Sequence, residues 1–274
     1  MTQLAPAPPS AASNSENVLV AFAREVFAVA NAEFRKLRRD PTEVLTRSVQ
    51  PILWLLVFGQ VFTRLRAIPT GSLSYLDFMA PGVLAQSVLF TAIFYGIAVI
   101  WERDLGIVQK MLVSPAFRSA LVLGKAASAG FRGLSQTVII YVVTLVLGVK
   151  VRFEALPFLG VLLAVLLGSA VFSTFSLAIA CIVKTRERFM GIGQVLTMPL
   201  FFASNAIYPL EAMPGWLQVL ARGNPLTYLV DALRSLMVVG GHSALGLGRD
   251  FLVELGTLIL LVIVAARLYP SLTR

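Results

Sequence analysis

Long apolar runs separated by short charged blocks dominate the chain. The run at 78–101 holds no charged residue over 24 positions, and the run at 155–183 is also free of charge. A helix needs about 20 apolar residues to cross the hydrocarbon core of a bilayer. Both runs therefore predict transmembrane helices rather than buried elements of a water-soluble domain.

Four further apolar segments complete the pattern, at 48–62, 126–149, 189–207 and 251–269. The first is short, and we expect it to span only if the flanking turns with Arg47 and Arg64 extend it, because long basic side chains can reach the interface. The predicted fold is an all-α integral membrane protein with six transmembrane helices.

The N-terminal region divides into two parts. Residues 1–17 are rich in Pro, Ala and Ser and lack an apolar stretch, which predicts a disordered cytoplasmic tail. Residues 18–40 place apolar side chains on one helical arc and Arg24, Arg35 and Arg38 opposite them, which predicts an amphipathic interfacial helix. The transmembrane domain then occupies 41–274.

Two connections between the apolar segments are too long for simple turns. The stretch 101–125 contains an apolar piece that ends in Ser114-Pro115, which predicts a short helix stopped by proline. The stretch 206–250 is apolar but interrupted by Pro214 and by Asn224-Pro225. We expect it to form an outer re-entrant helical hairpin, because irregular backbone at membrane depth must pack against protein.

Composition and charge agree with a membrane protein. Hydrophobic residues make up 57% of the chain and charged ones 14%, with a mean hydropathy of +0.82 and a net charge of +9. With the N-terminus in the cytoplasm, sixteen of the 23 Lys and Arg residues fall on that side. The positive-inside rule therefore predicts a multi-pass plasma membrane protein with both termini cytoplasmic, and it explains the basic balance without a nucleic-acid partner.

The residues needed for catalysis or metal binding are scarce. His242 is the only histidine and Cys181 the only cysteine, so no metal site or acyl-transfer triad is expected. The Gly124-Lys125 pair is followed by Ala126 rather than Ser or Thr, and Ser119 replaces the first glycine of a phosphate loop. We expect no catalytic residues, no enzyme activity and no cofactor bound by this chain.

The outer carboxylates Glu211, Asp231 and Glu254 lack an acid–base partner, and we expect them to pair with arginines such as Arg234 or to meet water. The middle of every predicted span lacks a carboxylate. This argues against a proton- or sodium-coupled carrier, which usually has such a site at mid-membrane depth.

Three features together resemble the ABC-2 permease family, the membrane subunits of type V ABC exporters, and in particular its daunorubicin-resistance-like branch. They are the amphipathic helix, the loop from Glu102-Arg103 through Gly106 to Pro115, and the run Asn224-Pro225 through Arg234. The resemblance covers nearly the whole chain from about residue 20. It implies two permease copies, as a homodimer or a heterodimer, in membrane lipid above two cytoplasmic ABC ATPase subunits that bind ATP and Mg.

The resemblance also implies three sets of site residues. ATPase coupling would fall on Glu102, Arg103, Asp104, Gly106, Leu112 and Pro115. The translocation path would fall on Phe58, Gln60, Phe62, Gln86, Phe90, Phe94, Phe201, Phe202 and Asn205. The outer gate would fall on Asn224, Pro225, Tyr228, Asp231 and Arg234. Simpler interpretations stay open for each set: a solvated loop, phenylalanines that face lipid, and amides that join helices.

The predicted function is export of a hydrophobic or amphipathic, drug-like or lipid-like molecule driven by a partner ATPase. A glycan or glycolipid exporter of the same fold is one alternative. A membrane scaffold that recruits an ATPase without transport is another. A membrane-embedded enzyme fits less well, because the chain lacks a His, Asp and Cys constellation.

Overall fold

The computed structural model describes residues 24, 27, 31, 35, 42–65, 68–107, 118–183 and 185–269, without the side chains of 42–44 and 118–120. The predicted tail at 1–17 and all but four residues of the predicted interfacial helix at 18–40 lie outside this range. So do Leu112 and Pro115 of the predicted coupling segment.

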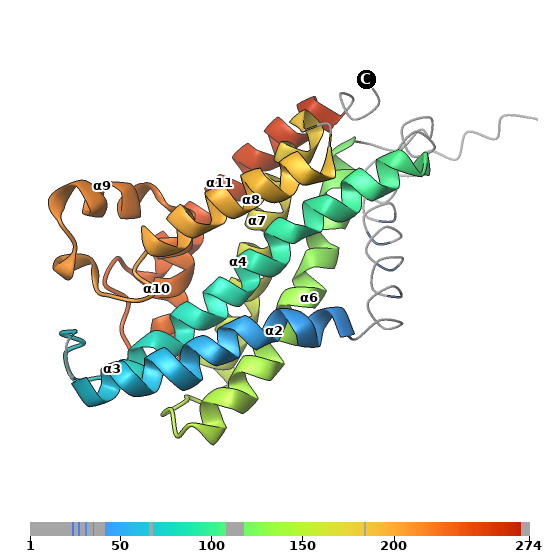
Figure 1. Ribbon diagram of the computed structural model, residues 1–274. Coiled ribbons are helices and arrows are strands. Elements are labelled where there is room, and N and C mark those ends of the chain that lie inside the picture. The colour runs from blue at the N-terminus through green and yellow to red at the C-terminus, as the bar shows by residue number, and fades with distance from the viewer. Residues whose placement is uncertain are drawn as a thin grey trace, which may run out of the picture.

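The described part is all-helical (Figure 1). Its elements are α2 (Thr42–Leu53), the π-helix η1 (Trp54–Gly59), α3 (Gln60–Leu65), α4 (Tyr75–Asp104), α6 (Arg118–Val146), α7 (Ala155–Ile182), α8 (Arg186–Phe202), the 3₁₀ turn η2 (Leu210–Ala212), α9 (Gly215–Gly223), α10 (Pro225–Met237) and α11 (Leu247–Leu268). Within the described ranges, β pairing is limited to one isolated antiparallel bridge between Val151 and Val238.

Five segments are long and apolar enough to cross a membrane: Leu45–Leu65, Tyr75–Asp104, Leu121–Val146, Ala155–Ile182 and Leu247–Leu268. The multi-pass prediction is confirmed. The fifth predicted span, at 189–207, corresponds to α8, which has 17 residues, begins with charged side chains and ends at Phe202. The count of six spans is therefore not confirmed.

Helix α4 lies at the centre of the bundle and packs against α6, α7, α8, α10 and the first span. In its most apolar window, 78% of the residues are buried by protein, against 22% for Leu45–Leu65 and 11% for Leu247–Leu268. Small residues allow the close approach: the Gly96 amide donates to Ser176 Oγ at 3.0 Å, and a Cβ on Gly96 would lie 2.3 Å from that oxygen.

The first span is extended as the sequence requires, but it is less regular. It runs from Leu45 to Leu65 and so includes the turns with Arg47 and Arg64, three residues beyond each of the predicted limits of 48–62. Pro51 lies inside α2 and lacks the amide that an α-helix needs at this position, and the π-helix follows from Trp54 to Gly59. The middle of the span is thus the place where the helix departs from α geometry.

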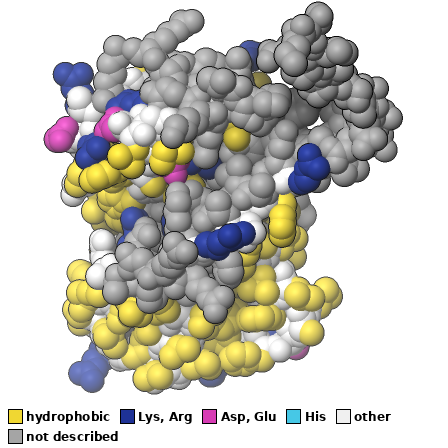
Figure 2. Space-filling model, turned by 90° about the vertical axis from the view of Figure 1, so that its right-hand side faces the viewer, with side chains coloured by type: hydrophobic (Ala, Val, Ile, Leu, Met, Phe, Trp, Pro, Cys, Tyr) yellow, Lys and Arg dark blue, Asp and Glu magenta, His cyan; other side chains and the backbone are white. Residues whose placement is uncertain are grey.

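The outward faces of α6 and α7 are apolar. Val138, Val142 and Leu145 on α6 and Leu159 and Leu163 on α7 are exposed. Figure 2 shows hydrophobic side chains gathered over much of the described surface on one face. Helices with such outward faces are expected where lipid is the solvent.

Each end of the bundle has its own polar cluster. At one end, the last turn of α4 meets the end of α7 and the start of α8; we name this the Asp104 end. At the other, the start of α4 meets α10 and the 205–211 stretch; we name this the Asp231 end.

Candidate functional site

At the Asp104 end, three charged side chains join α4 to its neighbours. Asp104 accepts from Arg186 of α8 at 2.7 Å and from Arg103 at 3.1 Å. Arg103 also donates to the carbonyl of Val183, just past α7, at 3.3 Å. The last turn of α4 is therefore tied to the end of α7 and the start of α8.

Glu102 makes a second tie, to α6. Its Oε2 lies 2.5 Å from Lys125 Nζ, and the two side chains are 8% and 2% exposed. Lys125 also lies 5.8 Å from the centroid of the Tyr95 ring. The predicted coupling residue Glu102 is therefore not exposed: a buried ammonium on α6 draws the carboxylate inward, where it joins two helices.

Gly106 ends α4. Its φ of +73° lies in the left-handed region that glycine adopts most easily, and its amide donates to the Arg103 carbonyl at 2.9 Å. Glycine at this position therefore sets the direction in which the chain leaves the helix.

Two exposed apolar side chains at the same end were not predicted from sequence. Trp101 is 50% exposed, although Arg186 lies 3.6 Å from its ring centroid, and Leu105 is 67% exposed. They could have been found from the sequence as apolar residues within a charged stretch. They give this end an apolar contact surface beside the ion pairs.

The predicted translocation residues separate into several groups. Phe58, Phe62, Phe201 and Phe202 belong to one aromatic cluster, which also includes Trp54 and Tyr75. Trp54 links its members, with ring centroids 4.5 Å from Phe58 and 5.9 Å from Phe201. The cluster joins the irregular first span to α8 and α4, and Phe58 and Phe202 remain 42% and 43% exposed. Trp54 and Tyr75 were missed because they were not singled out among the many aromatic residues.

The other predicted path residues lie elsewhere. Phe90 and Phe94 stack on each other at 6.5 Å along α4. Gln86 is buried with its Oε1 unpartnered, whereas Gln60 is exposed on α3. Asn205 belongs to the Asp231 end, where its carbonyl accepts from Arg234 at 2.6 Å. A single protomer does not gather all nine residues along one surface.

The predicted outer gate contains a cap that serves two helices. Asn224 Oδ1 accepts from the Leu226 amide at 3.0 Å and caps α10, while Pro225 occupies its first turn. The Asn224 amide also donates to the carbonyls of Leu200 and Ala203 at 2.6 and 2.8 Å. One side chain therefore satisfies groups at the end of α8 and the start of α10.

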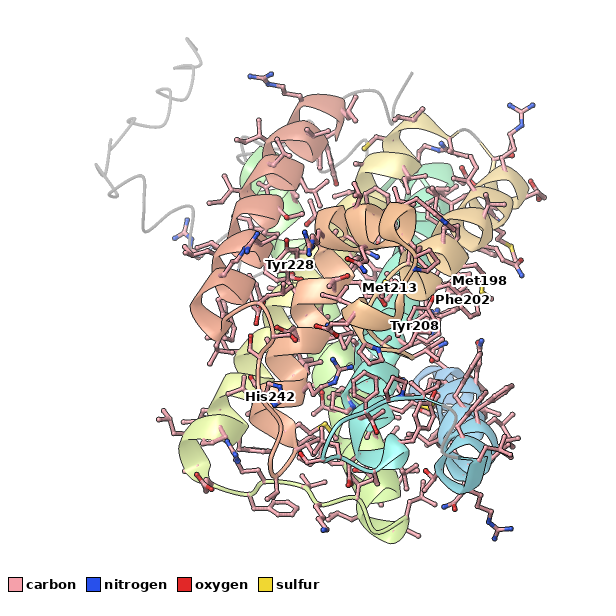
Figure 3. All side chains as sticks on the ribbon, turned by 90° about the vertical axis from the view of Figure 1, so that its left-hand side faces the viewer. Met198, Phe202, Tyr208, Met213, Tyr228 and His242 are labelled. Carbon is pink, nitrogen blue, oxygen red and sulfur yellow. The ribbon has the colours of Figure 1, made fainter. Side chains whose placement is uncertain are left out.

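Tyr228 closes the connection between α9 and α10, since its hydroxyl donates to the Arg222 carbonyl at 2.7 Å. Figure 3 shows Tyr228 on α10 towards the centre of the molecule, with Phe202 and Met198 on α8 to one side. The stretch predicted as a re-entrant hairpin thus forms two helices, of which α10 is largely buried and α9 largely exposed.

Asp231 and Arg234 are both buried but do not bond each other. Asp231 accepts from Ser243 Oγ, Ala244 N and Leu245 N at 2.7, 3.2 and 2.8 Å. Arg234 donates to the carbonyls of Asn205 and Phe78 and stacks 3.8 Å from the Phe78 ring centroid. Burial lowers the pKa of Arg234 to about 10, so it remains charged near neutral pH. The predicted pairing is replaced by bonds to backbone, which hold three segments together.

A pocket of about 250 Å³ opens beside these residues. Its lining includes Phe78, Asn205, Glu211, Asp231, Arg234 and His242. Figure 3 places His242 near the far end of α10. Among the described residues, no group of three or more His, Cys, Asp or Glu side chains is arranged to hold a metal ion.

Comparison with known proteins gives a consistent result. The sequence profile of the ABC-2 type transporter family matches residues 24–238. The putative transport permease ycf38 of Cyanophora paradoxa is 29% identical over 222 residues, which cover 78% of this chain and 74% of the relative. The daunorubicin resistance ABC transporter permease protein DrrB1 of Streptomyces coeruleorubidus is 25% identical over 197 residues, covering 72% and 69%. The probable doxorubicin resistance ABC transporter permease protein DrrC of Mycobacterium tuberculosis is 25% identical over 233 residues, covering 85% and 83%.

Proposed function

The chain belongs to the ABC-2 type transporter family, and from this premise we propose that it is the membrane subunit of an ATP-driven exporter in the plasma membrane. The family match is the observation that carries the proposal. The five membrane-length helices support it. In this proposal α8 makes a sixth crossing, since it begins at the Asp104 end and ends beside Asn224, so that the Asp104 end and both termini face the cytoplasm and the Asp231 end faces outward.

The energy source is a separate pair of cytoplasmic ABC ATPase subunits, where ATP and Mg bind. The Asp104 end suits contact with them because Trp101 and Leu105 offer exposed apolar surface beside charged groups, a combination common at protein interfaces. The ties from Glu102 to Lys125 and from Asp104 to Arg186 would then pass a displacement of this end on to α6 and α8.

A second permease copy, identical or related, completes the transporter. The first span supports this step, since protein buries only 22% of its most apolar window and Phe58, within the π-helix, remains exposed. Two such faces would enclose a path lined by the aromatic cluster.

The cargo is a hydrophobic or amphipathic molecule, drug-like or lipid-like. The aromatic cluster supports this class, because flat apolar rings favour contact with apolar surface over hydrated sugar. Relatives named for daunorubicin and doxorubicin resistance support it further.

Transport by the complete complex in proteoliposomes tests the proposal. We expect ATP-dependent movement of an amphipathic fluorescent dye or a fluorescent phospholipid, and no movement of a labelled oligosaccharide. Phe58→Ala should reduce the rate, whereas Leu163→Ala, an exposed apolar change on α7, should leave it unchanged. Oligosaccharide export would favour the glycan alternative, and ATP hydrolysis without movement of any probe would favour the scaffold.

A further inference from the structure

The seam between α10 and α11 buries several acidic groups at the Asp231 end. Asp231 on α10 and Asp250 on α11 are both 0% exposed, and Glu254, one turn further along α11, is 3% exposed. We call these three residues the acidic seam. Glu254 is the eighth residue of the membrane-length segment Leu247–Leu268, which places it about 10 Å from the start of that helix.

Ser243 lies between the carboxyl groups of Asp231 and Asp250 and indicates that one of them carries a proton. Its Oγ lies 2.7 Å from Asp231 Oδ2 and 3.0 Å from Asp250 Oδ2, and it accepts from the Gly246 amide at 2.7 Å. A hydroxyl has one proton to donate, so it cannot donate to two carboxylates at once. Both contacts are full hydrogen bonds only when one of the two carboxyls carries a proton and donates it to Ser243.

The surroundings identify the protonated partner. Asp231 also accepts from two backbone amides, which stabilise a negative charge. Asp250 has no such donors, and its Oδ1 lacks a partner. The arrangement is therefore Asp250 O–H to Ser243 Oγ, and Ser243 O–H to Asp231.

Glu254 provides an independent observation. Both of its carboxyl oxygens are buried without a hydrogen-bond partner. An ionised carboxylate in that position would lack the donors and the water that make its charge tolerable. A proton on Glu254 removes the charge without requiring any additional space.

We propose that the acidic seam is a proton-binding site, in which Asp250 and Glu254 hold protons while α10 and α11 are packed together. Release of these protons would place negative charge on Asp250 and Glu254 next to the charge of Asp231. Repulsion along the seam would then loosen α10 from α11. The site stands apart from the proposed export function, since it follows from the described groups alone.

Among the described residues, no cation is hydrogen-bonded to the unpartnered oxygens of Asp250 and Glu254, although the charge of Arg249 acts on Asp250. Helix α7, which packs against α11, contains no charged residue from Ala155 to Ile182. On α10, Arg234 is held by two carbonyls, and on α11 Arg249 is exposed. On α6, Lys125 bonds Glu102 and Arg132 lies over the Tyr95 ring, both towards the Asp104 end. His242 is exposed in the loop before Ser243.

Infrared spectroscopy of the full-length chain in lipid nanodiscs tests the site, because a protonated carboxyl has a carbonyl stretch that a carboxylate lacks. At neutral pH we expect a carboxylic-acid band that shifts in D₂O. Asp250→Asn and Glu254→Gln should each remove a component, and the double variant should remove the band. Glu154→Gln, at an exposed carboxylate near the same end, should leave it unchanged.

Misfolding could also remove the band, so conservative variants provide a second test. Asp250→Glu and Glu254→Asp keep the acid and should shift their component rather than abolish it. Absence of the band in the wild type at neutral pH would overturn the proposal. So would a band that both Asp250→Asn and Glu254→Gln leave intact, or one that added sodium removes at constant pH.

Discussion

Glu102 and Glu254 are both buried glutamates, but the two ends of the molecule treat them differently. At the Asp104 end, Lys125 approaches Glu102 to 2.5 Å. At the Asp231 end, neither carboxyl oxygen of Glu254 has a hydrogen-bond partner. The first glutamate can remain charged as a permanent tie between helices, whereas the second is suited to carry a proton. Burial alone thus does not decide the role of an acidic residue in a membrane protein; its immediate partners do.

The difference predicts opposite responses to similar substitutions. Loss of one member of a buried ion pair leaves a charge without its partner, which is costly, whereas replacing a neutral acid by its amide removes no charge.

The largest effect is expected for Lys125→Met, which leaves Glu102 buried without this ammonium. We expect the free energy of unfolding to fall by about 3–5 kcal/mol, measured by denaturant titration in mixed micelles. Lys150→Met, an exposed lysine, should change it by less than about 0.5 kcal/mol. Adding Glu102→Gln to Lys125→Met should recover part of the loss. Equal effects of the two lysine changes would contradict a structural ion pair.

Asn224→Ala should have the next largest effect, about 2 kcal/mol, because it removes the cap of α10 and two donors to α8 carbonyls. The same unfolding measurement checks it. Asn224→Ser keeps a capping oxygen and loses the donors without placing a charge beside the Leu200 and Ala203 carbonyls, so its cost should fall between those of wild type and alanine. If serine is as costly as alanine, the cap on α10 contributes nothing.

Gly106→Ala should cost about 1–2 kcal/mol, since alanine resists the left-handed conformation that ends α4. Gly191→Ala is its matched control: this glycine lies inside α8 with open space around its Cβ position. Alanine there should be neutral or stabilising. Comparison of the two melting temperatures separates backbone strain from a general effect of the added methyl group.

The smallest effect is expected for Glu254→Gln in mildly acidic buffer, within about 0.5 kcal/mol of wild type, because the glutamate is then protonated in the folded and the unfolded chain and glutamine has nearly the same shape as the acid. The measurement is denaturant titration from mildly acidic to neutral pH. As the pH rises, the wild type should lose stability, because the unfolded glutamate ionises while the folded one keeps its proton, and the variant should lose less. Parallel curves would indicate that the folded chain does not keep Glu254 protonated in this range.

Much of the fold follows from the pattern of apolar runs. The runs at 78–101 and 155–183 become α4 and α7, because no alternative hides so many apolar residues from water. Local departures from regular α-helix geometry were harder to predict from the sequence. Pro51 indicated a departure from α geometry but not the π-helix at Trp54–Gly59, and the end of α8 at Phe202 is held by bonds from Asn224, more than 20 residues away.

The sequence identified individual site residues but not the groups that bind them. The sequence indicated Glu102, Asp231 and Arg234 but not their surroundings, because Lys125 is 23 residues from Glu102 and the groups that bind Asp231 are 12 to 14 residues away. Glu254 was expected to pair with an arginine or meet water. Its burial depends on how α11 packs against α7 and α10, which residue spacing does not specify.

In the proposed function, the Asp104 end contacts the partner ATPase. The most direct test is ATP hydrolysis by the complex formed when the chain is co-expressed with its partner ATPase, comparing wild type with Leu105→Asp and Val239→Asp. Both replace an exposed apolar side chain, 67% and 50% exposed, at opposite ends of the molecule. We predict that Leu105→Asp releases the ATPase or abolishes stimulation of hydrolysis by cargo, while Val239→Asp preserves both. Full association and stimulation with Leu105→Asp would contradict the account.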